Sequence, residues 1–239
     1  MYGTSTVTRS GDTVYGFNST ATGPLAQVFD FNANPYPVLT LFDSGGNDTL
    51  DFSGWSDPSR IDLVPGAYSS GNEMTNNVAI AYSTTIENAI GGGGNDVIAG
   101  NDAANRLVGG AGDDQLSAGA GDDLLDGGPG NDALDGGAGT DTAVFSASFS
   151  SFTITVSGNT ALLSSAASGS DRAVGVERFQ FADVLRTLSD LTGGVATDTS
   201  APLLQTLTPG DNSSAVTPGA NLVLSFNEAV KPGSGSVSI

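Results

Sequence analysis

Residues 91–144 read GGGGNDVIA, GNDAANRLV, GGAGDDQLS, AGAGDDLLD, GGPGNDALD and GGAGTDTAV, which are six consecutive units of nine residues. The units share the pattern G-G-x-G-x-D-x-U-x, where U is a large apolar residue. Five of the six units keep Asp at the sixth position, and the second unit has Asn105 there. A register held over six units, with U retained, favours a repeat fold over a Gly- and Asp-rich linker.

The pattern predicts what each part of a unit does. Glycine-rich loops adopt positive φ at little cost, and the following x-U-x triplet forms a short strand with U on one face. If two units complete one coil, loops stack at a separation of eighteen residues. Asp96, Asp114 and Asp132 then line one edge, with Asp114 in its middle. Asn105, Asp123 and Asp141 line the other edge, with Asp141 at its end.

Such rows of carboxylates repel one another unless cations lie between them. Sites made only of oxygen, with six or more ligands in an irregular cage, are typical of Ca²⁺ rather than Zn²⁺. The formal net charge of −19, from 26 acidic and 7 basic residues, also makes cations the natural partners. It excludes nucleic acid and anionic membranes as partners, and no stretch reaches the roughly 20 apolar residues that membrane insertion requires.

The chain contains neither Cys nor His. This excludes disulfides, thiol nucleophiles, Ser-His-Asp triads and His-bound zinc. A carboxylate-pair glycosidase or lyase is the enzymatic alternative, with Asp113–Asp114 and Asp122–Asp123 as candidate pairs. Adjacent residues on one loop do not oppose each other across a bond, and the repeats hold no aromatic residue to line a cleft. We therefore expect no catalytic activity.

The six units resemble the RTX nonapeptide repeats, which build a calcium-bound parallel β-roll. The resemblance implies that each ion lies between stacked loops, held by backbone carbonyls and sixth-position carboxylates. On one edge it assigns Gly92, Gly94 and Asp96 with Gly109, Ala111 and Asp114, then Gly110, Gly112 and Asp114 with Gly127, Pro129 and Asp132. On the other edge it assigns Gly119, Gly121 and Asp123 with Gly136, Ala138 and Asp141. A site on Asn101, Ala103 and Asn105 departs from the motif and is expected to be weak or empty.

The segments TRSGDTVYGFN (8–18), DSGGNDTLDFSGW (43–55) and TIENAIGGGGND (85–96) resemble the C-terminal domain of serralysin-type secreted metalloproteases. This likeness covers about residues 2–144. It implies further calcium ligands, namely Arg9, Gly11 and Thr13 with Asp43, Gly45 and Asp48, and Gly46 and Asp48 with Thr85 and Glu87. The alternative for Asp43 and Asp48 is a turn-forming role beside glycine. The zinc-binding His motif of the catalytic domain is absent, so we expect a fragment without that domain.

After the repeats, residues 145–191 alternate like short strands and are expected to cap the roll. Glu177 and Asp183 are expected to be solvated strand positions rather than an acid/base pair. Residues 192–202 are predicted to be a linker. Residues 203–239 resemble the start of an S-layer-type bacterial Ig-like domain, which is too short for a complete sandwich.

The fold class expected is therefore all-β: a parallel β-roll solenoid over 91–144, a pre-roll β part over 1–90, β-strand flanking caps and an incomplete Ig-like tail. The function expected is a module that binds several calcium ions, without zinc, in a secreted serralysin-like metalloprotease. The resemblance implies an extracellular location, export by type I secretion machinery, and the parent's N-terminal protease domain as a partner. The alternative is the calcium-stiffened stalk of an RTX/Ig-like surface adhesin.

Overall fold

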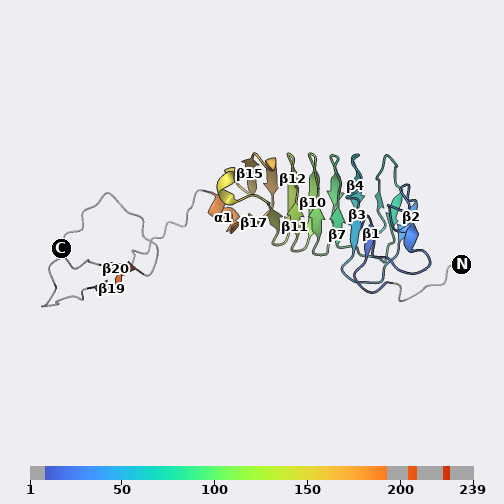
Figure 1. Ribbon diagram of the computed structural model, residues 1–239, viewed down its shortest axis with the longest axis horizontal. Helices are drawn as coiled ribbons and strands as arrows, with labels where there is room; N and C mark the ends of the chain where they lie inside the picture. Colours follow the sequence, from blue (N-terminus) through green and yellow to red (C-terminus); the bar gives the residue numbers. More distant parts are fainter. Residues whose placement is uncertain (1–8, 193–203, 209–222, 227–239) are drawn as a thin grey trace. The chain divides into compact units, whose positions relative to one another are not determined.

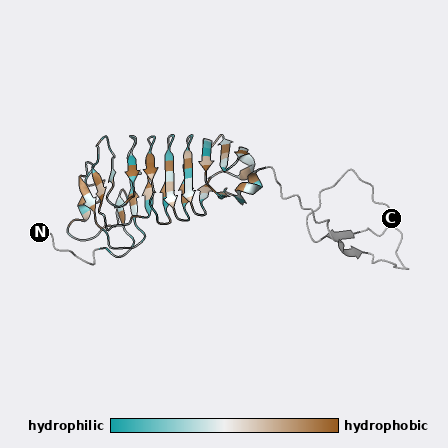
Figure 2. Cartoon of the chain, turned by 180° about the vertical axis from the view of Figure 1, so that it is seen from behind, coloured by the Kyte–Doolittle hydropathy of each residue, from teal (hydrophilic) through white to brown (hydrophobic). Residues whose placement is uncertain are grey.

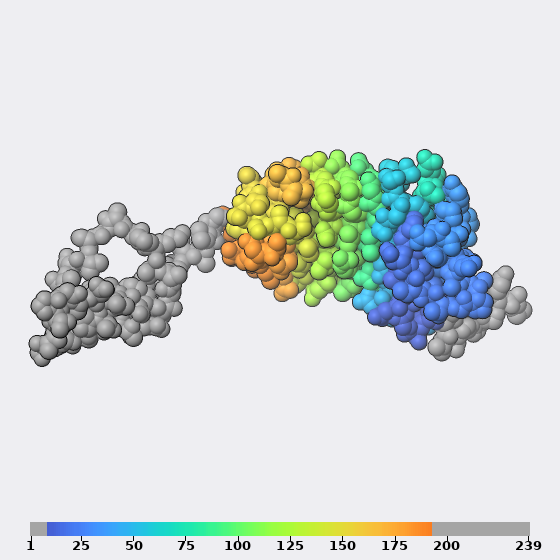
Figure 3. Space-filling model, viewed as in Figure 1, coloured from blue at the N-terminus to red at the C-terminus, as the bar shows by residue number. Residues whose placement is uncertain are grey.

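A computed structural model describes residues 9–192, 204–208 and 223–226. The chain divides into two compact units, Met1–Gly194 and Val195–Ile239. In the first unit, short and mostly parallel strands lie side by side along the long axis of the unit (Figure 1). The colours of Figure 3 show that segments follow one another along this axis roughly in the order of the sequence. The expectation of an all-β fold with parallel sheets is confirmed.

One sheet of the first unit contains eight strands, and most adjacent strands within it are parallel. Within the repeats these strands lie eighteen residues apart, so Leu107 pairs with Leu125 and Leu125 with Ala143. In sheet order the strands are β1 (Val14–Gly16), β3 (Thr49–Asp51), β7 (Asn88–Ile90), β9 (Arg106–Val108), β11 (Leu124–Asp126), β13 (Thr142–Val144), β17 (Arg178–Gln180) and β18 (Leu185–Thr187).

The opposite sheet contains seven strands, and Ile98, Leu116 and Leu134 pair in its parallel part. Successive nonapeptides therefore alternate between the two sheets, as the expected coil of two units requires. In sheet order the strands are β14 (Thr153–Ser157), β15 (Thr160–Ser165), β16 (Gly169–Val174), β12 (Ala133–Ala138), β10 (Gln115–Ala120), β8 (Val97–Ala99) and β4 (Arg60–Asp62).

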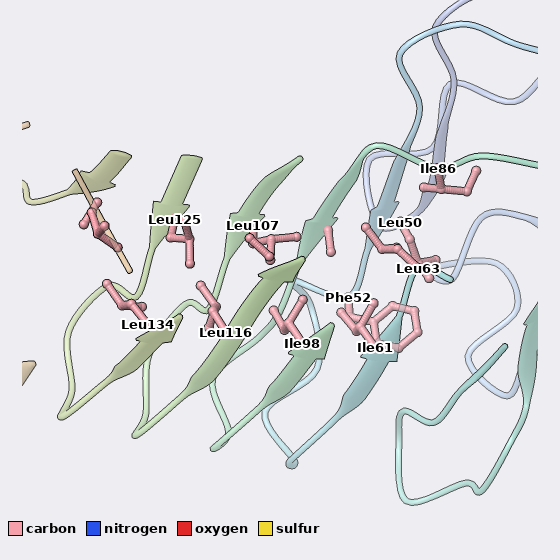
Figure 4. Packing of buried hydrophobic residues seen from close by; sticks show 14 of the residues in the cluster. Leu50, Phe52, Ile61, Leu63, Ile86, Ile98, Leu107, Leu116, Leu125 and Leu134 are labelled. Atoms are coloured by element: carbon pink, nitrogen blue, oxygen red, sulfur yellow. The ribbon is translucent and has the colours of Figure 1, made fainter. Parts of the chain in front are cut away.

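The apolar core is a thin seam between these sheets. The U positions of all six units are at most 2% exposed. Figure 4 shows Leu107 and Leu125 from one sheet facing Ile98, Leu116 and Leu134 from the other. In the repeats, each three-residue strand carries one buried residue between more exposed neighbours, which explains the mixture of hydrophobic and hydrophilic colours along these strands in Figure 2.

The core of the segment before the repeats contains packed aromatic residues. Phe31 stacks on Trp55 with ring centroids 5.0 Å apart, and Phe52 lies edge-on to Trp55 at 4.6 Å. A three-stranded sheet and one 3₁₀ helix complete this end of the unit. They are β2 (Leu39–Leu41), β6 (Val78–Ile80), β5 (Tyr68–Ser69) and η1 (Ala26–Val28).

The segment after the repeats covers the other end. Strands β14 and β15 form an antiparallel hairpin, and β15 pairs with β16, which returns to lie parallel to β12. The helices here are η2 (Phe149–Ser151) and α1 (Leu188–Leu191). The short strands expected over residues 145–191 are present, and they extend both sheets beyond the last repeat.

The second unit is described only at β19 (Leu204–Thr208) and β20 (Val223–Phe226), which pair antiparallel. Most of the expected linker and most of the expected Ig-like segment lie outside the described residues. In the described ranges, no helix combines the length and apolar character needed to cross a bilayer.

Candidate metal sites

Buried aspartates form a ladder along one edge of the roll. Each side chain in the ladder accepts a hydrogen bond from the backbone N–H of the residue that lies one coil earlier in the chain. Asp96 N–H donates to Asp114 Oδ1 at 2.7 Å, and Asp114 N–H donates to Asp132 Oδ1 at 2.9 Å. The ladder starts at Ser59, whose N–H donates to Asp96 Oδ1 at 2.6 Å. It continues past the repeats, because Asp132 N–H donates to Asp171 Oδ1 at 3.1 Å.

A second ladder runs along the other edge. Asn105 N–H donates to Asp123 Oδ1 at 2.7 Å, and Asp123 N–H donates to Asp141 Oδ1 at 2.9 Å. The expectation that Asp141 ends this edge is wrong, because Asp141 N–H donates to Glu177 Oε2 at 2.9 Å. The predicted edges of the roll are thus present, and both continue beyond the last repeat, to Asp171 and to Glu177.

The other carboxylate oxygen of most of these aspartates is buried without a partner, whereas Oδ2 of Asp96 accepts Gly92 N–H at 2.6 Å. Within the described residues, this holds for Oδ2 of Asp48, Asp114, Asp123, Asp132, Asp141 and Asp171. These six side chains are at most 3% exposed. The one ion pair in the described part of the chain joins Arg60 to Asp62, so no basic side chain forms an ion pair with the ladders. Buried, unpaired carboxylate oxygens are costly, and a cation would relieve that cost.

The electrostatics of the carboxyl groups agree with this geometry. Burial raises the pKa of Asp132 to about 7; a backbone hydrogen bond opposes the rise, and the neighbouring carboxylates add to it. Burial likewise raises the pKa of Asp48, Asp114, Asp123 and Asp171 to about 6. Without a cation, the ladders therefore take up protons at a higher pH than exposed aspartates do.

The glycines of each unit leave room for the carboxylates and for the stacked loops. A Cβ at Gly109 or Gly127 would overlap Oδ2 of Asp114 or Asp132, respectively. A Cβ at the fourth-position Gly112 or Gly121, both with positive φ, would press on the carbonyl of the loop eighteen residues earlier. Only residues without a side chain let the loops stack this closely around the carboxylate rows.

The loop residues expected to offer carbonyl oxygens stack in the predicted pairs. Gly110 lies against Gly92 and Gly112 against Gly94, while Gly112 N–H donates to Pro129 O at 3.1 Å. On the other edge, Gly121 N–H donates to Ala138 O at 2.9 Å. The structure brings together, on their two edges, Gly92, Gly94, Asp96, Gly109, Gly110, Ala111, Gly112, Asp114, Gly127, Pro129 and Asp132, and Gly119, Gly121, Asp123, Gly136, Ala138 and Asp141.

The donor set is made only of oxygen. Across the described residues, no group of three or more His, Cys, Asp or Glu side chains is placed to hold a metal. A cation between two loops would therefore need backbone carbonyls in addition to its one or two carboxylates. This mixture of carboxylate and carbonyl oxygen suits Ca²⁺.

Three of the predicted pre-roll ligands, Thr13, Asp48 and Glu87, lie along the same edge as Asp141. Thr13 N–H donates to Asp48 Oδ1 at 2.8 Å, and Asp48 N–H donates to Glu87 Oε2 at 2.7 Å. Gly46 stacks against Gly11, and Asn47 N–H donates to Asp12 Oδ1 at 2.8 Å. Residues 11–13 and 46–48 are therefore stacked like two loops of the roll.

The other pre-roll residues that were predicted as calcium ligands make different contacts. Both oxygens of Asp43 have partners, since it accepts hydrogen bonds from the Tyr15 hydroxyl and from Gly45 N–H. The Arg9 guanidinium lies 4.4 Å from the centroid of the Phe29 ring. Thr85 is exposed, two residues before Glu87 in the chain. The geometry favours a cation at Asp48 more than at Asp43.

The degenerate second unit fills its loop with amide groups. Asn105 Nδ2 donates to Glu87 O at 2.9 Å and to Asn101 Oδ1 at 3.1 Å. Asn101 Nδ2 donates to the carbonyls of Leu63 and Ile86 at 3.1 and 2.8 Å. These side-chain amides donate hydrogen bonds to carbonyl oxygens that could otherwise coordinate a cation.

Sequence reasoning missed Asp171, and it treated Glu177 as a solvated strand position. Glu177 is exposed, yet it holds the last N–H of its ladder, while Asp183 accepts Phe149 N–H at 2.8 Å. The available signal was the tetrad D-x-U-x, which recurs as DRAV (171–174) and, with Glu, as ERFQ (177–180).

With this geometry in place, the chain was compared with known proteins. The model of the family described as "Peptidase M10 serralysin C terminal" matches residues 4–196, well over half of the chain. Serralysin of Proteus mirabilis is 50% identical over 107 residues, which cover 45% of this chain and 21% of that protein. Metallopeptidase AprA of Pseudomonas marginalis is 49% identical over 105 residues, which cover 44% and 22%.

The matched region therefore spans about a fifth of the length of these relatives. A solved structure, the extracellular lipase LipA from Serratia marcescens, matches with a TM-score of 0.28 and 19% identity, covering 59% of this chain and 20% of that one. That likeness is too weak to bear on the fold, so the assignment rests on the sequence matches.

Proposed function

The chain belongs to the peptidase M10 serralysin C-terminal family, and we propose that it is the calcium-binding module of a secreted metalloprotease, which folds when it meets calcium outside the cell. The observation that carries this proposal is the set of six buried Oδ2 atoms without a hydrogen-bond partner, aligned along the stacked loops. In the described residues, no basic side chain forms an ion pair with these carboxylates.

The residues expected to hold calcium are the sixth-position aspartates together with carbonyls of the loops on either side. When bound, calcium supplies positive charge between carboxylates that otherwise repel. The protein contributes the spacing. The strand pairing keeps successive loops in register, and Oδ1 of each aspartate is already fixed by a backbone N–H.

This arrangement makes folding conditional. The repeats contain ten Asp and one Arg, so the roll is expected to stay unfolded where calcium is scarce. If one site binds at about 10⁻⁴ M, 1 mM calcium adds roughly 1.4 kcal/mol. Three or four coupled sites then add about 5 kcal/mol, which is comparable to the whole stability of a small domain.

We assign no catalytic step to this chain, because it holds neither His nor Cys. Peptidase chemistry would belong to a separate N-terminal zinc-binding domain of the parent, which the roll would support. An unfolded, cysteine-free chain in low calcium also suits passage through type I secretion machinery. Secretion, the protease partner and the extracellular location are parts of this proposal.

Far-ultraviolet circular dichroism during a calcium titration, from chelator to about 10 mM, tests the proposal. We expect a cooperative gain of β signal with calcium and none with magnesium, which dehydrates reluctantly and demands octahedral geometry. A full β signal in chelator, unchanged by calcium, would contradict it.

A further inference from the structure

The hairpin turn before β16 continues the repeat where the sequence no longer keeps the period of nine. In the last repeats, the fourth-position Gly112 N–H donates to the third-position Pro129 O at 3.1 Å. One coil later, Gly130 N–H donates to Ser168 O at 3.0 Å. Ser168 therefore occupies the third position of a further loop, although it is 39 residues beyond Pro129 instead of eighteen.

The next positions of this loop agree with that alignment. At the fifth position, Asn131 N–H donates to Asp113 Oδ1 at 2.8 Å, and Ser170 N–H donates to Asn131 Oδ1 at 3.0 Å. Gly169 has a φ of +84°, and a Cβ there would overlap the carbonyl oxygen of Gly130, as one at Gly130 would overlap that of Gly112. Residues 168–171 thus reproduce positions three to six of a nonapeptide, while Ala166 and Ala167 form the turn in place of the two leading glycines.

Two buried carboxylates meet at this loop. Asp132 and Asp171 are each 3% exposed, and Oδ2 of each lacks a hydrogen-bond partner. A cavity of about 10 Å³ lies beside them, roughly the space of one water molecule or one ion. Its lining includes Asp132, Asp171, Ser168 and Gly128.

We infer that Asp132 and Asp171 bind a further divalent cation, Ca²⁺, at the junction between the last repeat of this edge and the cap. This inference rests on the proposed function, because it extends the same chemistry to a loop outside the nonapeptide array. The ligands are the two carboxylates and backbone oxygens of the loops around Gly128 and Ser168. The ion would join β16 to β12, and so attach the cap to the end of the roll.

This site gives the cap a role beyond covering an edge. Strands β14, β15 and β16 form one antiparallel group, and β16 is the strand through which they continue the parallel sheet. Without a cation, Oδ2 of Asp132 and Oδ2 of Asp171 are buried without a partner beside the same small cavity. Docking of the β14–β16 group is therefore expected to depend on calcium in the same way as stacking of the repeats.

The test compares calcium counts in the full chain and two matched variants. In Asp171→Asn, the amide oxygen can still accept Asp132 N–H, while the unpartnered carboxylate oxygen is replaced by an amide nitrogen. The control, Asp102→Asn, removes the same charge from an exposed loop residue. Native mass spectrometry at saturating calcium is expected to show one ion fewer in Asp171→Asn and no change in Asp102→Asn.

The possible outcomes separate this inference from the proposed function. A wild-type chain without bound calcium would overturn both. A wild-type chain that binds calcium, with an equal count in Asp171→Asn, would overturn this inference alone. If Asp171→Asn does not fold, wild-type crystals grown with calcium decide the matter by anomalous scattering. A peak between Asp132 and Asp171 supports the site, and peaks confined to the repeat loops overturn it.

Discussion

The ladder aspartates with an unpartnered Oδ2 use their two carboxylate oxygens differently. In Asp114, Oδ1 accepts the N–H of Asp96, while Oδ2 is buried without a partner and fills the space above Gly109. One oxygen therefore maintains the stacking of the loops, and the other is available to a cation. A substitution that keeps the first and removes the second separates binding from local structure.

Asp114→Asn is such a substitution, and we predict that it removes two calcium ions. Asp114 lies between Asp96 and Asp132 in its ladder, so its carboxylate borders two loop pairs. Equilibrium dialysis with radioactive calcium checks the count, with Asp102→Asn as the control of equal charge. A loss of one ion or none would show that the carboxylate is not shared between stacked sites.

Asn105→Asp tests the opposite change. The new carboxylate cannot donate to Glu87 O or Asn101 Oδ1, and it adds a buried charge above Asp123. We expect one additional bound calcium ion, and a metal-free protein less stable by about 1–3 kcal/mol. Dialysis gives the ion count and chemical denaturation in chelator gives the stability. An unchanged ion count would mean that Asn101 alone keeps the loop closed to cations.

At the scale of the element, the loops determine how closely the coils can stack. Parallel strands lie about 4.8 Å apart, and each loop must keep that spacing to stay in step with its strand. Gly139 has a φ of +145°, and a Cβ there would overlap the carbonyl oxygen of Gly121. Gly93, by contrast, lacks a positive φ, and its nearest neighbour would be 3.6 Å from a Cβ.

We therefore predict that Gly139→Ala destabilises the calcium-bound roll by more than about 2 kcal/mol, because backbone strain of order 1–3 kcal/mol adds to the overlap. Gly93→Ala is expected to change stability by less than about 0.5 kcal/mol. Thermal unfolding of both variants at saturating calcium measures the difference. Equal melting temperatures would show that the loops have room for side chains.

The same elements show how far sequence could predict this fold. The period of nine predicted the strands of residues 91–144, their alternation between two sheets and the buried U positions. The period of nine does not extend to Asp171, because the β14–β15 hairpin separates this aspartate from Asp132 and because Ala166 and Ala167 replace the leading glycines; the local signal there is the tetrad DRAV (171–174). Backbone pairing restores the register there, and pairing between distant segments is not visible in a local pattern.

At the scale of the whole molecule, two ladders of buried carboxylates make folding depend on protons as well as on calcium. The pKa of Asp132 is raised to about 7 and that of Asp114, Asp123 and Asp171 to about 6, mainly by burial. Between about pH 4 and pH 7, the metal-free folded state therefore holds more protons than the unfolded state. Its stability must fall as pH rises through this range.

We predict that, in calcium-depleted buffer, the chain is more folded at pH 5 than at pH 8. With calcium present the order reverses, because protons compete for the same oxygens and binding is weaker at pH 5. Circular dichroism and calcium titrations at both pH values measure the two effects. In Asp132→Asn, the change between pH 6 and pH 8 should shrink, since the group with the highest pKa is gone. Metal-free stability that rises from pH 5 to pH 8 would contradict the account, because it would mean that the folded ladders favour ionised carboxylates without a cation.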